Sequence, residues 1–487
     1  MSEKKLDNND LRKIEEFFNK GKFHEGLSFL NQLKKENDDL MLNWYLSHIY
    51  FKLHKYDEAL KYVKEFINLK SNDVLNLNFL GQIYLEKNRI ELAVKTFEQA
   101  LAIKNDDKTT ILNLAKVFLY IGEIDKSKSY FQKLSKSEPE NLSYIYSLMR
   151  INDNKLTLNL IEKIKKNLDN YNLENKMYGN LILAKFYENE KNYDLEVENL
   201  IEAHKVYISS KKKSSYQQIN FIKNLLPTFI KEFNQIDFIS KSKLNPIFIM
   251  GLPRSGTTLV EKIITSGKKK LQSLGESDVF DKVFFSEKII ENYESETLIS
   301  KFQFNNENIN ILDEKIMDQL YAQGLKKNNN FFINKSISNF LYIDLIYKIY
   351  PNAKFVYCYR NPAANVLGIF RSFLPNVLWS HSLEVIFDVV DFYYKKLNQI
   401  KSEKIINIYT LDLENLTDNP EIVSKDLFRF LDLEWTSDCI KNINKNLIIK
   451  TASNLQVRKE IEKHDLSYTS NYINIFKKLG FNYRWLN

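Results

Sequence analysis

The N-terminal part of the chain repeats itself every 34 residues, and this period constrains its fold more than any other feature. A leucine recurs with this spacing at three positions, Leu46, Leu80 and Leu114. A small residue recurs in the same three units, at Ala59, Ala93 and Ser127. Units of this length hold two helices, and the small side chain lets one helix approach its partner closely. Weaker copies lie on either side, so we expect an all-α solenoid of stacked helix pairs over residues 1–215.

This pattern resembles the tetratricopeptide repeat. Arrays of that family commonly present a concave groove to peptides or proteins, so the resemblance implies a protein partner bound through the repeat groove. Two other uses stay open, since the array could join two copies of the chain as a homodimer or brace the rest of the protein. A lysine run at 211–213, flanked by serines, is interpreted as a solvated linker. We expect a linker or connecting helix over residues 216–244 and a second domain over residues 245–487.

Composition narrows the class of protein. At 487 residues, the chain is long enough for two or more domains. Its 70 basic residues are interleaved with 62 acidic ones, and the net charge of +8 argues against a nucleic-acid partner but not against an anionic ligand. The first residues show no apolar leader, and no run reaches the roughly 18 apolar residues of a membrane helix. We expect a cytoplasmic protein without a membrane span, in which Cys358 and Cys439 are buried free thiols.

From residue 245 onward, short apolar segments alternate with amphipathic ones. Five of the apolar segments are predicted to be strands, at residues 247–250, 271–274, 331–333, 355–359 and 404–409. Strands that alternate with helices form a parallel sheet covered by helices, so we expect an α/β domain. Ligands of such sheets gather at the carboxyl ends of the strands. The polar residues directly after the strands are therefore the candidates for a functional site.

The strongest candidate follows the first strand, where Gly251-Leu-Pro-Arg-Ser-Gly-Thr-Thr258 leads into a helix. A strand, a glycine loop and a helix start together aim backbone N–H groups at a phosphate. The loop that binds ATP has a lysine directly after its second glycine. Here Thr257 follows Gly256, and the nearest cation is Arg254. We expect a P-loop-like phosphate site that is not built for the triphosphate of ATP.

A second phosphate signal follows the fourth strand. Arg360 precedes an Asn-Pro pair, and proline suits the first turn of a helix. An arginine beside a helix start can bind a phosphate through two parallel hydrogen bonds. Glu276 follows the second strand, and Asn334 and Lys335 follow the third. One carboxylate, one lysine and two arginines at one sheet edge predict the transfer of an anionic group to a hydroxyl.

These segments resemble the sulfotransferase family. Residues 251–258 are similar to its 5′-phosphosulfate-binding loop, and residues 355–362 are similar to its 3′-phosphate-binding segment. The resemblance covers residues 245 to about 480. It is closest to the bacterial tetratricopeptide–sulfotransferase fusions and more distant from the protein-tyrosine sulfotransferases. It implies 3′-phosphoadenosine 5′-phosphosulfate (PAPS) as co-substrate, no metal, and the transfer of a sulfuryl group to an acceptor hydroxyl.

The resemblance also implies a role for each candidate residue. The 5′-phosphosulfate would be held by Arg254 and by the backbone N–H groups of Ser255, Gly256, Thr257 and Thr258. Arg360 would bind the 3′-phosphate. Glu276 would be the catalytic base, while Lys335 and Ser453 would stabilise charge on the transferring group, a task that Arg254 shares.

Two positions depart from the family pattern. Gly368 stands eight residues after Arg360, where the family usually has a serine. Leu413 stands where an aromatic residue is expected near the adenine. His381 precedes a predicted helix and is interpreted as a capping or packing residue, and the histidines show no metal-ligand spacing.

Two rival functions stay open. A nucleotide or small-molecule kinase would be expected to have the missing loop lysine. A catalytically inactive repeat scaffold would have no need for the reactive groups described above. The acceptor is open as well. The repeats favour a peptide or protein, and the resemblance points to a tyrosine hydroxyl. A glycan or lipid-linked hydroxyl is nearly as well supported.

Overall fold

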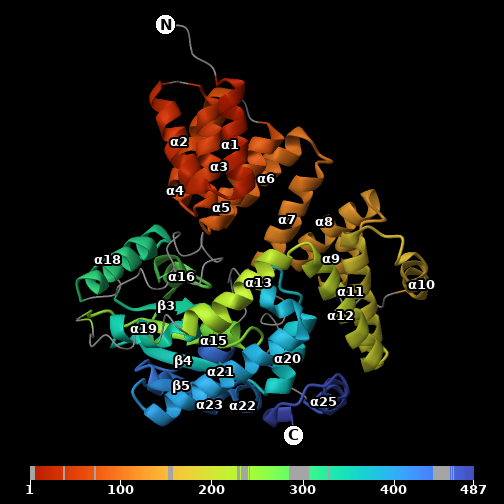
Figure 1. Ribbon diagram of the computed structural model, residues 1–487, viewed down its shortest axis with the longest axis vertical. Helices are drawn as coiled ribbons and strands as arrows, with labels where there is room; N and C mark the ends of the chain where they lie inside the picture. Colours follow the sequence, from red (N-terminus) through yellow and green to blue (C-terminus); the bar gives the residue numbers. More distant parts are fainter. Residues whose placement is uncertain are drawn as a thin grey trace. The chain divides into compact units, whose positions relative to one another are not determined.

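The chain divides into two compact units, Met1–Glu140 and Asn141–Asn487. The computed structural model (Figure 1) describes residues 6–36, 39–70, 73–151, 157–227, 231, 240, 242–284, 306–326, 330–441, 461, 463 and 466–486. Within these ranges, the first unit consists of helices and connecting turns, while the second adds a five-stranded sheet. The fold class expected from the sequence, a helical repeat array followed by an α/β domain, is confirmed.

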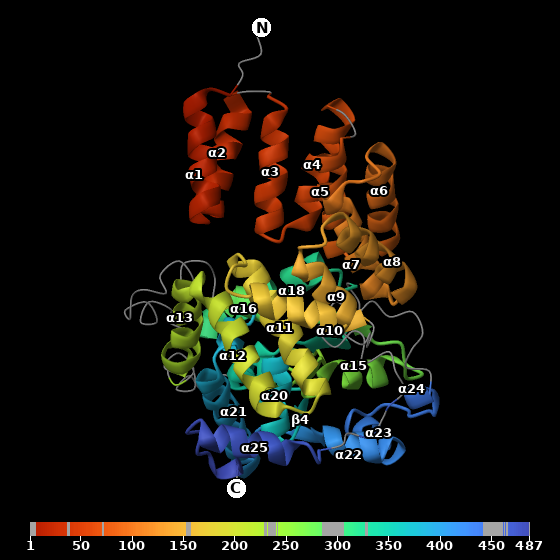
Figure 2. The same cartoon turned by 90° about the vertical axis from the view of Figure 1, so that its right-hand side faces the viewer.

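The first unit is a stack of helix pairs (Figure 2). Its helices are α1 (Asn8–Lys20), α2 (Phe23–Glu36), α3 (Met41–Lys52), α4 (Tyr56–Lys70), α5 (Val74–Glu86), α6 (Ile90–Ile103), α7 (Lys108–Ile121) and α8 (Ile124–Ser137). Each helix packs against the next one along the chain. The pairs α3–α4, α5–α6 and α7–α8 coincide with the three predicted repeat units.

The small residues of the repeat lie where paired helices meet. All three are fully buried in the second helix of their pair, at Ala59, Ala93 and Ser127. The Ser127 hydroxyl donates to the carbonyl of Ala115 in the facing helix at 2.7 Å. In the middle pair, a Cβ added to Gly81 would lie 2.4 Å from the ring of Phe97. The close approach predicted from the repeat is therefore present.

The second unit begins with further helices. They are α9 (Leu142–Ile151), α10 (Leu158–Asn167), α11 (Leu173–Asn189), α12 (Tyr193–Ser209), α13 (Lys212–Asn220) and a π-helical turn η1 (Phe221–Leu225). Helices α11 and α12 pack against each other. The lysine run at 211–213 lies at the start of α13.

The sheet contains five parallel strands in the order β2-β3-β1-β4-β5. Their bounds are β1 (Ile247–Met250), β2 (Gln272–Ser273), β3 (Phe332–Lys335), β4 (Lys354–Tyr359) and β5 (Ile408–Asp412). In the register of the two central pairs, Phe248 lies opposite Asn334 of β3 and opposite Phe355 of β4. Because all pairs are parallel, the ends of β1, β3 and β4 reach the same edge of the sheet.

One predicted strand was misplaced. The sequence predicted the fifth strand at 404–409, whereas β5 begins at Ile408. The preceding helix, α21 (Leu383–Glu403), continues up to the predicted start of the strand, and Lys404 ends it with a left-handed backbone, φ 54°. A residue in that conformation terminates a helix and cannot pair as a strand. The chain therefore needs several more residues before it enters the sheet.

Helices cover both faces of the sheet. The remaining ones are α15 (Thr257–Thr265), α16 (Val279–Phe284), α18 (Asn306–Ala322), η3 (Ser338–Tyr342), α19 (Ile343–Ile349), α20 (Pro362–Arg371), η4 (Leu378–His381), α22 (Leu413–Asp418), α23 (Pro420–Phe430), α24 (Asp438–Lys441), α25 (Thr469–Lys478) and η6 (Arg484–Leu486). Successive residues of β1 point to opposite faces. Ile247 and Ile249 join a core with α15 and α23, while Phe248 and Met250 join the larger core with α18 to α21.

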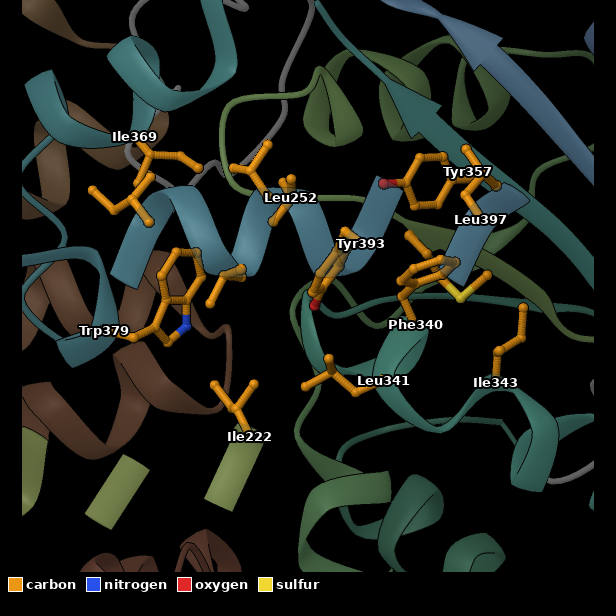
Figure 3. Close-up of a cluster of buried hydrophobic side chains, with 14 of the residues drawn as sticks. Ile222, Leu252, Phe340, Leu341, Ile343, Tyr357, Ile369, Trp379, Tyr393 and Leu397 are labelled. Atoms are coloured by element: carbon orange, nitrogen blue, oxygen red, sulfur yellow. The ribbon is translucent and has the colours of Figure 1, made fainter. Parts of the chain in front are cut away.

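The larger core includes helices that precede the sheet in the chain. Met177 and Leu181 of α11 and Val197 and Leu200 of α12 are buried in the same cluster as Phe248. Figure 3 shows another part of this cluster, in which the rings of Phe340 and Tyr393 lie side by side with centroids 4.9 Å apart. The compact unit that holds the sheet thus extends N-terminal to residue 245. The three-part division at 1–215, 216–244 and 245–487 stays a prediction.

Both cysteines lie in the second unit as free thiols. Cys358 is 1% exposed in β4, and Cys439 is fully buried in α24. Burial raises the pKa of the Cys358 thiol well above its ordinary value. The sequence-based expectation of two buried, unpaired thiols is confirmed.

Candidate functional site

The loop between β1 and α15 is held in a tight conformation. Three of its residues have positive φ: Gly251 at 153°, Arg254 at 68° and Gly256 at 90°. A Cβ at Gly251 would lie 2.5 Å from the Ser255 hydroxyl, so glycine is required there. The Ser255 hydroxyl in turn donates to the carbonyl of Leu252 at 2.8 Å. The helix begins at Thr257 as predicted, and the first N–H groups of a helix have no acceptor within the helix itself.

Two arginines meet behind this loop. The Arg360 guanidinium donates from Nη1 to the backbone carbonyl of Arg254 at 2.9 Å. Burial and the charge of Arg360 lower the pKa of Arg254 to about 10. Two neighbouring cations withdrawn from water repel each other, so an anion bound beside them would relieve an electrostatic cost.

A carboxylate that the sequence analysis did not single out balances part of this charge. Glu414 Oε1 lies 3.6 Å from Arg360 Nε, and its other oxygen accepts from the N–H of Asn361 at 3.2 Å. Burial raises the pKa of Glu414. The Asn361 side chain caps α20 by accepting from the N–H of Ala364 at 3.1 Å. Arg360 therefore lies beside a capped helix start, as expected from the Asn-Pro sequence.

The two departures from the family pattern both lie at this site. A Cβ on Gly368 would be 3.0 Å from Arg360 Nη1 and 3.3 Å from the Cβ of Arg254. Position 368 thus faces both arginines without offering a hydroxyl. Leu413 is 3% exposed, and its Cδ1 would be 2.6 Å from a Cβ added to Gly256. Its side chain supports the loop from within the protein.

Lys335 lies at the end of β3 and joins three oxygens. Its Nζ is 3.1 Å from the Thr258 hydroxyl, 3.0 Å from Glu261 Oε2 and 3.4 Å from Glu276 Oε1. The side chain is 4% exposed. Burial alone would lower its pKa, but the two carboxylates outweigh that effect and raise the pKa. The lysine is therefore a charged group held at the start of α15.

Glu276 is the accessible member of this cluster. Its side chain is 50% exposed, and it stands on the loop that follows β2. The loop is tied to β3 by the N–H of Lys335, which donates to the carbonyl of Gly275 at 2.9 Å. On its other side, the Ser277 hydroxyl donates to Gln323 Oε1 at 2.6 Å. A carboxylate in this setting can reach a proton on a group that enters from solvent.

The remaining candidates differ in their surroundings. Asn334 is fully buried and accepts from Asn339 Nδ2 at 2.7 Å. His381 Nδ1 lies 2.8 Å from Nδ1 of the buried His204, and its Nε2 lies 3.0 Å from the carbonyl of Leu374. Burial lowers the pKa of His381 to about 4. It occupies a packing position, as the sequence favoured. Ser453 lies outside the described residues.

Glu261 is the main residue that sequence reasoning missed. It follows Thr258 by three residues in α15, so the two side chains lie on one helix face. That spacing, beside a loop predicted to bind phosphate, is the signal that could have found it. In the part of the chain that the structure describes, no cluster of His, Cys, Asp or Glu is arranged to hold a metal ion. No helix within the described ranges has the length and apolarity needed to cross a membrane.

Each of the two units of the chain contains a segment that matches the model of a known family. Residues 246–437 match the model of the sulfotransferase family. This segment is a sulfotransferase domain. It contains the phosphate loop, Glu276, Lys335 and Arg360. Residues 44–73 and 76–107 match the model of the tetratricopeptide repeat, and these segments include most of α3 and α5 and all of α4 and α6.

The sequence relative that this chain matches is distant. An uncharacterized protein of Aquifex aeolicus (strain VF5) is 25% identical over 320 residues, and these cover 60% of this chain. The chain spans 39% of the length of that relative.

The solved structures that this chain matches have low sequence identity to it and low TM-scores. The sulfotransferase domain of the Synechococcus PCC 7002 olefin synthase is 15% identical, with a TM-score of 0.28 over 50% of this chain and 99% of that one. Sulfotransferase STF1 of Mycobacterium tuberculosis H37Rv is 13% identical, with a TM-score of 0.28 over 63% and 99%. MamA is 15% identical, with a TM-score of 0.26 over 43% and 99%. The assignment rests on the family models.

Proposed function

We propose that this protein is a PAPS-dependent sulfotransferase that moves a sulfuryl group to an acceptor hydroxyl. The observation that carries the proposal is the cluster formed by Thr258, Lys335 and Glu276 next to a phosphate-type loop. It combines an anion-binding helix start, a buried cation and an accessible carboxylate. These are the elements that sulfuryl transfer to a hydroxyl requires.

The residues present fit PAPS because they offer two separate places for anionic groups. Arg254 and the N–H groups of residues 255–258 would hold the 5′-phosphosulfate at the start of α15. Arg360, beside the start of α20, would hold the 3′-phosphate. The Arg360 guanidinium is bonded to the backbone of Arg254, and the charge of Arg360 acts on Arg254, so the two cationic residues favour an anionic ligand on charge grounds. When bound, PAPS supplies the activated sulfuryl group.

Sulfuryl transfer resembles phosphoryl transfer, in which positioning and charge stabilisation dominate. The acceptor oxygen would form a bond to sulfur as the bond from sulfur to the phosphate oxygen breaks. Glu276 would take the proton of the acceptor hydroxyl, and adenosine 3′,5′-bisphosphate would leave. Lys335 would stabilise charge that develops on the transferring group. Ser453 is proposed to assist it, on the family resemblance alone.

The repeats support a peptide or protein acceptor, with a protein tyrosine as the leading candidate and a glycan as the next. In this proposal, the protein acts in the cytoplasm, and the repeat groove binds the acceptor or a partner protein. The proposal needs no nucleic-acid partner and no metal. An inactive repeat scaffold is the alternative that the following experiment separates from an enzyme.

The test is thermal stabilisation of the full chain by adenosine 3′,5′-bisphosphate compared with ATP plus Mg²⁺. A ligand that binds only the folded state raises Tm by mass action. We expect a shift with the bisphosphate alone, and its loss in Arg360→Ala. The matched control is Arg429→Ala, which removes an arginine that is 79% exposed on α23. A shift with ATP alone would indicate a kinase, and no shift with either ligand would favour the scaffold.

A further inference from the structure

Glu261 connects the two groups assigned to chemistry above. Its side chain is 16% exposed, and one oxygen lies 3.0 Å from Lys335 Nζ. The other oxygen accepts a hydrogen bond from the Ser273 hydroxyl. Ser273 Oγ also accepts from the N–H of Gly275 at 3.1 Å, directly before Glu276. One carboxylate thus contacts the lysine and, through one serine, holds the loop that carries the proposed base.

The lysine contacts are not equivalent. An ammonium has three N–H donors, and three oxygens surround Nζ, those of Thr258, Glu261 and Glu276. To donate to a sulfuryl oxygen, Lys335 must give up one of them. The contact to Glu276 is the longest, at 3.4 Å, and its carboxylate is half exposed to water. Releasing that contact costs less than releasing Glu261, which is closer and more buried.

We propose that Glu261 is the positioning residue of this site. It keeps Lys335 charged and directed toward the transferring group, so that Glu276 can leave the lysine and act as a base. This inference rests on the proposed function. The two carboxylates that contact the same lysine then have different roles. The buried one anchors the cation, and the exposed one handles the proton.

The proposal predicts what happens when Glu261 loses its charge. In Glu261→Gln, the remaining carboxylate near Lys335 is Glu276, which would draw the lysine toward itself and away from the sulfuryl group. Binding of the nucleotide part would persist, because Arg254, Arg360 and the loop are unchanged. The specific loss is the extra affinity that the sulfuryl group contributes.

The experiment measures the Kd of PAPS and of adenosine 3′,5′-bisphosphate by calorimetry on the full chain, and compares their ratio between variants. A charge-assisted hydrogen bond to the sulfuryl group should favour PAPS roughly tenfold in the wild type. We expect this preference to disappear in Glu261→Gln and in Lys335→Ala, with bisphosphate affinity retained. Glu421→Gln, at an exposed ion pair on α23, should keep it.

Two further measurements separate positioning from a merely structural role. In Glu261→Gln/Glu276→Gln, no carboxylate competes with the sulfuryl group for the lysine. The bound anionic PAPS would then favour the charged lysine in place of the carboxylates, so the preference for PAPS should return. Glu261→Asp, with a shorter side chain, serves as a second variant if Glu261→Gln does not fold. It should lose part of the preference.

The outcomes test the proposed function and the role of Glu261 separately. If the wild type binds neither nucleotide, the proposed function fails. If it binds the bisphosphate without preferring PAPS, Lys335 does not contact the sulfuryl group and the inference about Glu261 is wrong. The inference is equally overturned if Glu261→Gln keeps the preference while Lys335→Ala loses it, or if the double variant shows no recovery.

Discussion

The helices of the first unit and helices α11 and α12 of the second unit differ in what they are packed against. In the first unit, each helix packs on its neighbours along the chain, and the buried clusters are formed by residues of successive helices. Helices α11 and α12 also form a pair, but they share a core with β1, α20 and α21. A helix pair can therefore be a repeat in sequence and still be part of the domain that follows it.

The helices of the first unit and helix α12 also differ in how far their ion pairs are buried. Glu196 of α12 is 1% exposed and binds Arg371 of α20 through both oxygens, at 2.6 and 2.9 Å. The hydroxyl of Tyr472 in α25 donates to the same carboxylate at 2.6 Å. In the first unit, Lys87 of one repeat pairs with Asp57 of the repeat before it. The lysine side chain is 11% exposed and the aspartate 67%. This pair, with its carboxylate in water, contrasts with the buried network between α12 and the sulfotransferase domain.

The largest expected effect concerns truncation. A chain that starts at residue 245 lacks the buried side chains of Met177, Leu181, Val197 and Leu200. Each large apolar side chain contributes about 1.5–3 kcal/mol on burial, against a total domain stability of about 5–15 kcal/mol. We expect residues 245–487 to be insoluble or unfolded, and residues 141–487 to fold and bind the bisphosphate. Circular dichroism melting and calorimetry measure both. Cooperative melting of the shorter chain would break the comparison.

The next effect comes from the buried network. Arg371→Ala leaves the Glu196 carboxylate buried without its cation, and removing one partner of a buried pair costs about 3–5 kcal/mol. Lys87→Ala removes an ion pair of the first unit whose carboxylate is exposed to water, and the loss of that pair should cost less than about 1 kcal/mol. Denaturant unfolding of the full chain measures both variants. Equal losses would show that the two regions do not differ in the way described.

A smaller effect should appear in the first unit alone. Gly81→Ala places a methyl group 2.4 Å from the Phe97 ring, and overpacking of this kind costs about 1–3 kcal/mol. The positions one period before and after are Ser47 and Ala115, which shows that the restriction belongs to this helix pair. We expect a lower melting transition for the repeats and unchanged bisphosphate binding. Reduced bisphosphate binding would mean that the second unit depends on the packing of the first.

The effect that is smallest near neutral pH is a pH dependence of the repeats. The ring of His48 stacks on Phe79 with centroids 3.8 Å apart, and burial lowers its pKa from 6.5 to about 4. The unfolded chain therefore takes up this proton more readily than the folded one. Stability should fall as the pH drops from about 6.5 to about 4, by at most about 1.4 kcal/mol per pH unit. His48→Gln should lose this slope, which urea titrations of the first unit's transition can detect. An unchanged slope would place its origin elsewhere.

Local patterns predicted the parts of the fold that depend on neighbouring residues. The glycines at 251 and 256 and the start of α15 at Thr257 follow from the turn between a strand and a helix. The repeat units follow from their period. The start of β5 was missed because it depends on how far α21 continues, which no short pattern encodes.

The sequence likewise predicted only part of the candidate site. Glu276 and Lys335 were found because the sequence placed each just after a strand. In the structure Lys335 is the last residue of β3, and parallel strands bring their ends together. Glu261 was missed because its importance lies in contacts with Ser273 and Lys335, which come from two other strands. The packing of α12 on α20 joins Glu196 to a residue 175 positions away. Such contacts depend on the tertiary arrangement.

The two cysteines allow the opening of one unit to be measured by the reactivity of their thiols. Both thiols of the chain, Cys358 and Cys439, are buried in the second unit, and the first unit has none. An alkylating reagent can therefore react only when the core around the sheet opens, whatever the repeats are doing. The rate of alkylation in the native protein would report the opening of the sulfotransferase domain without any added label. Its slowing by a nucleotide would show how firmly the ligand closes that core.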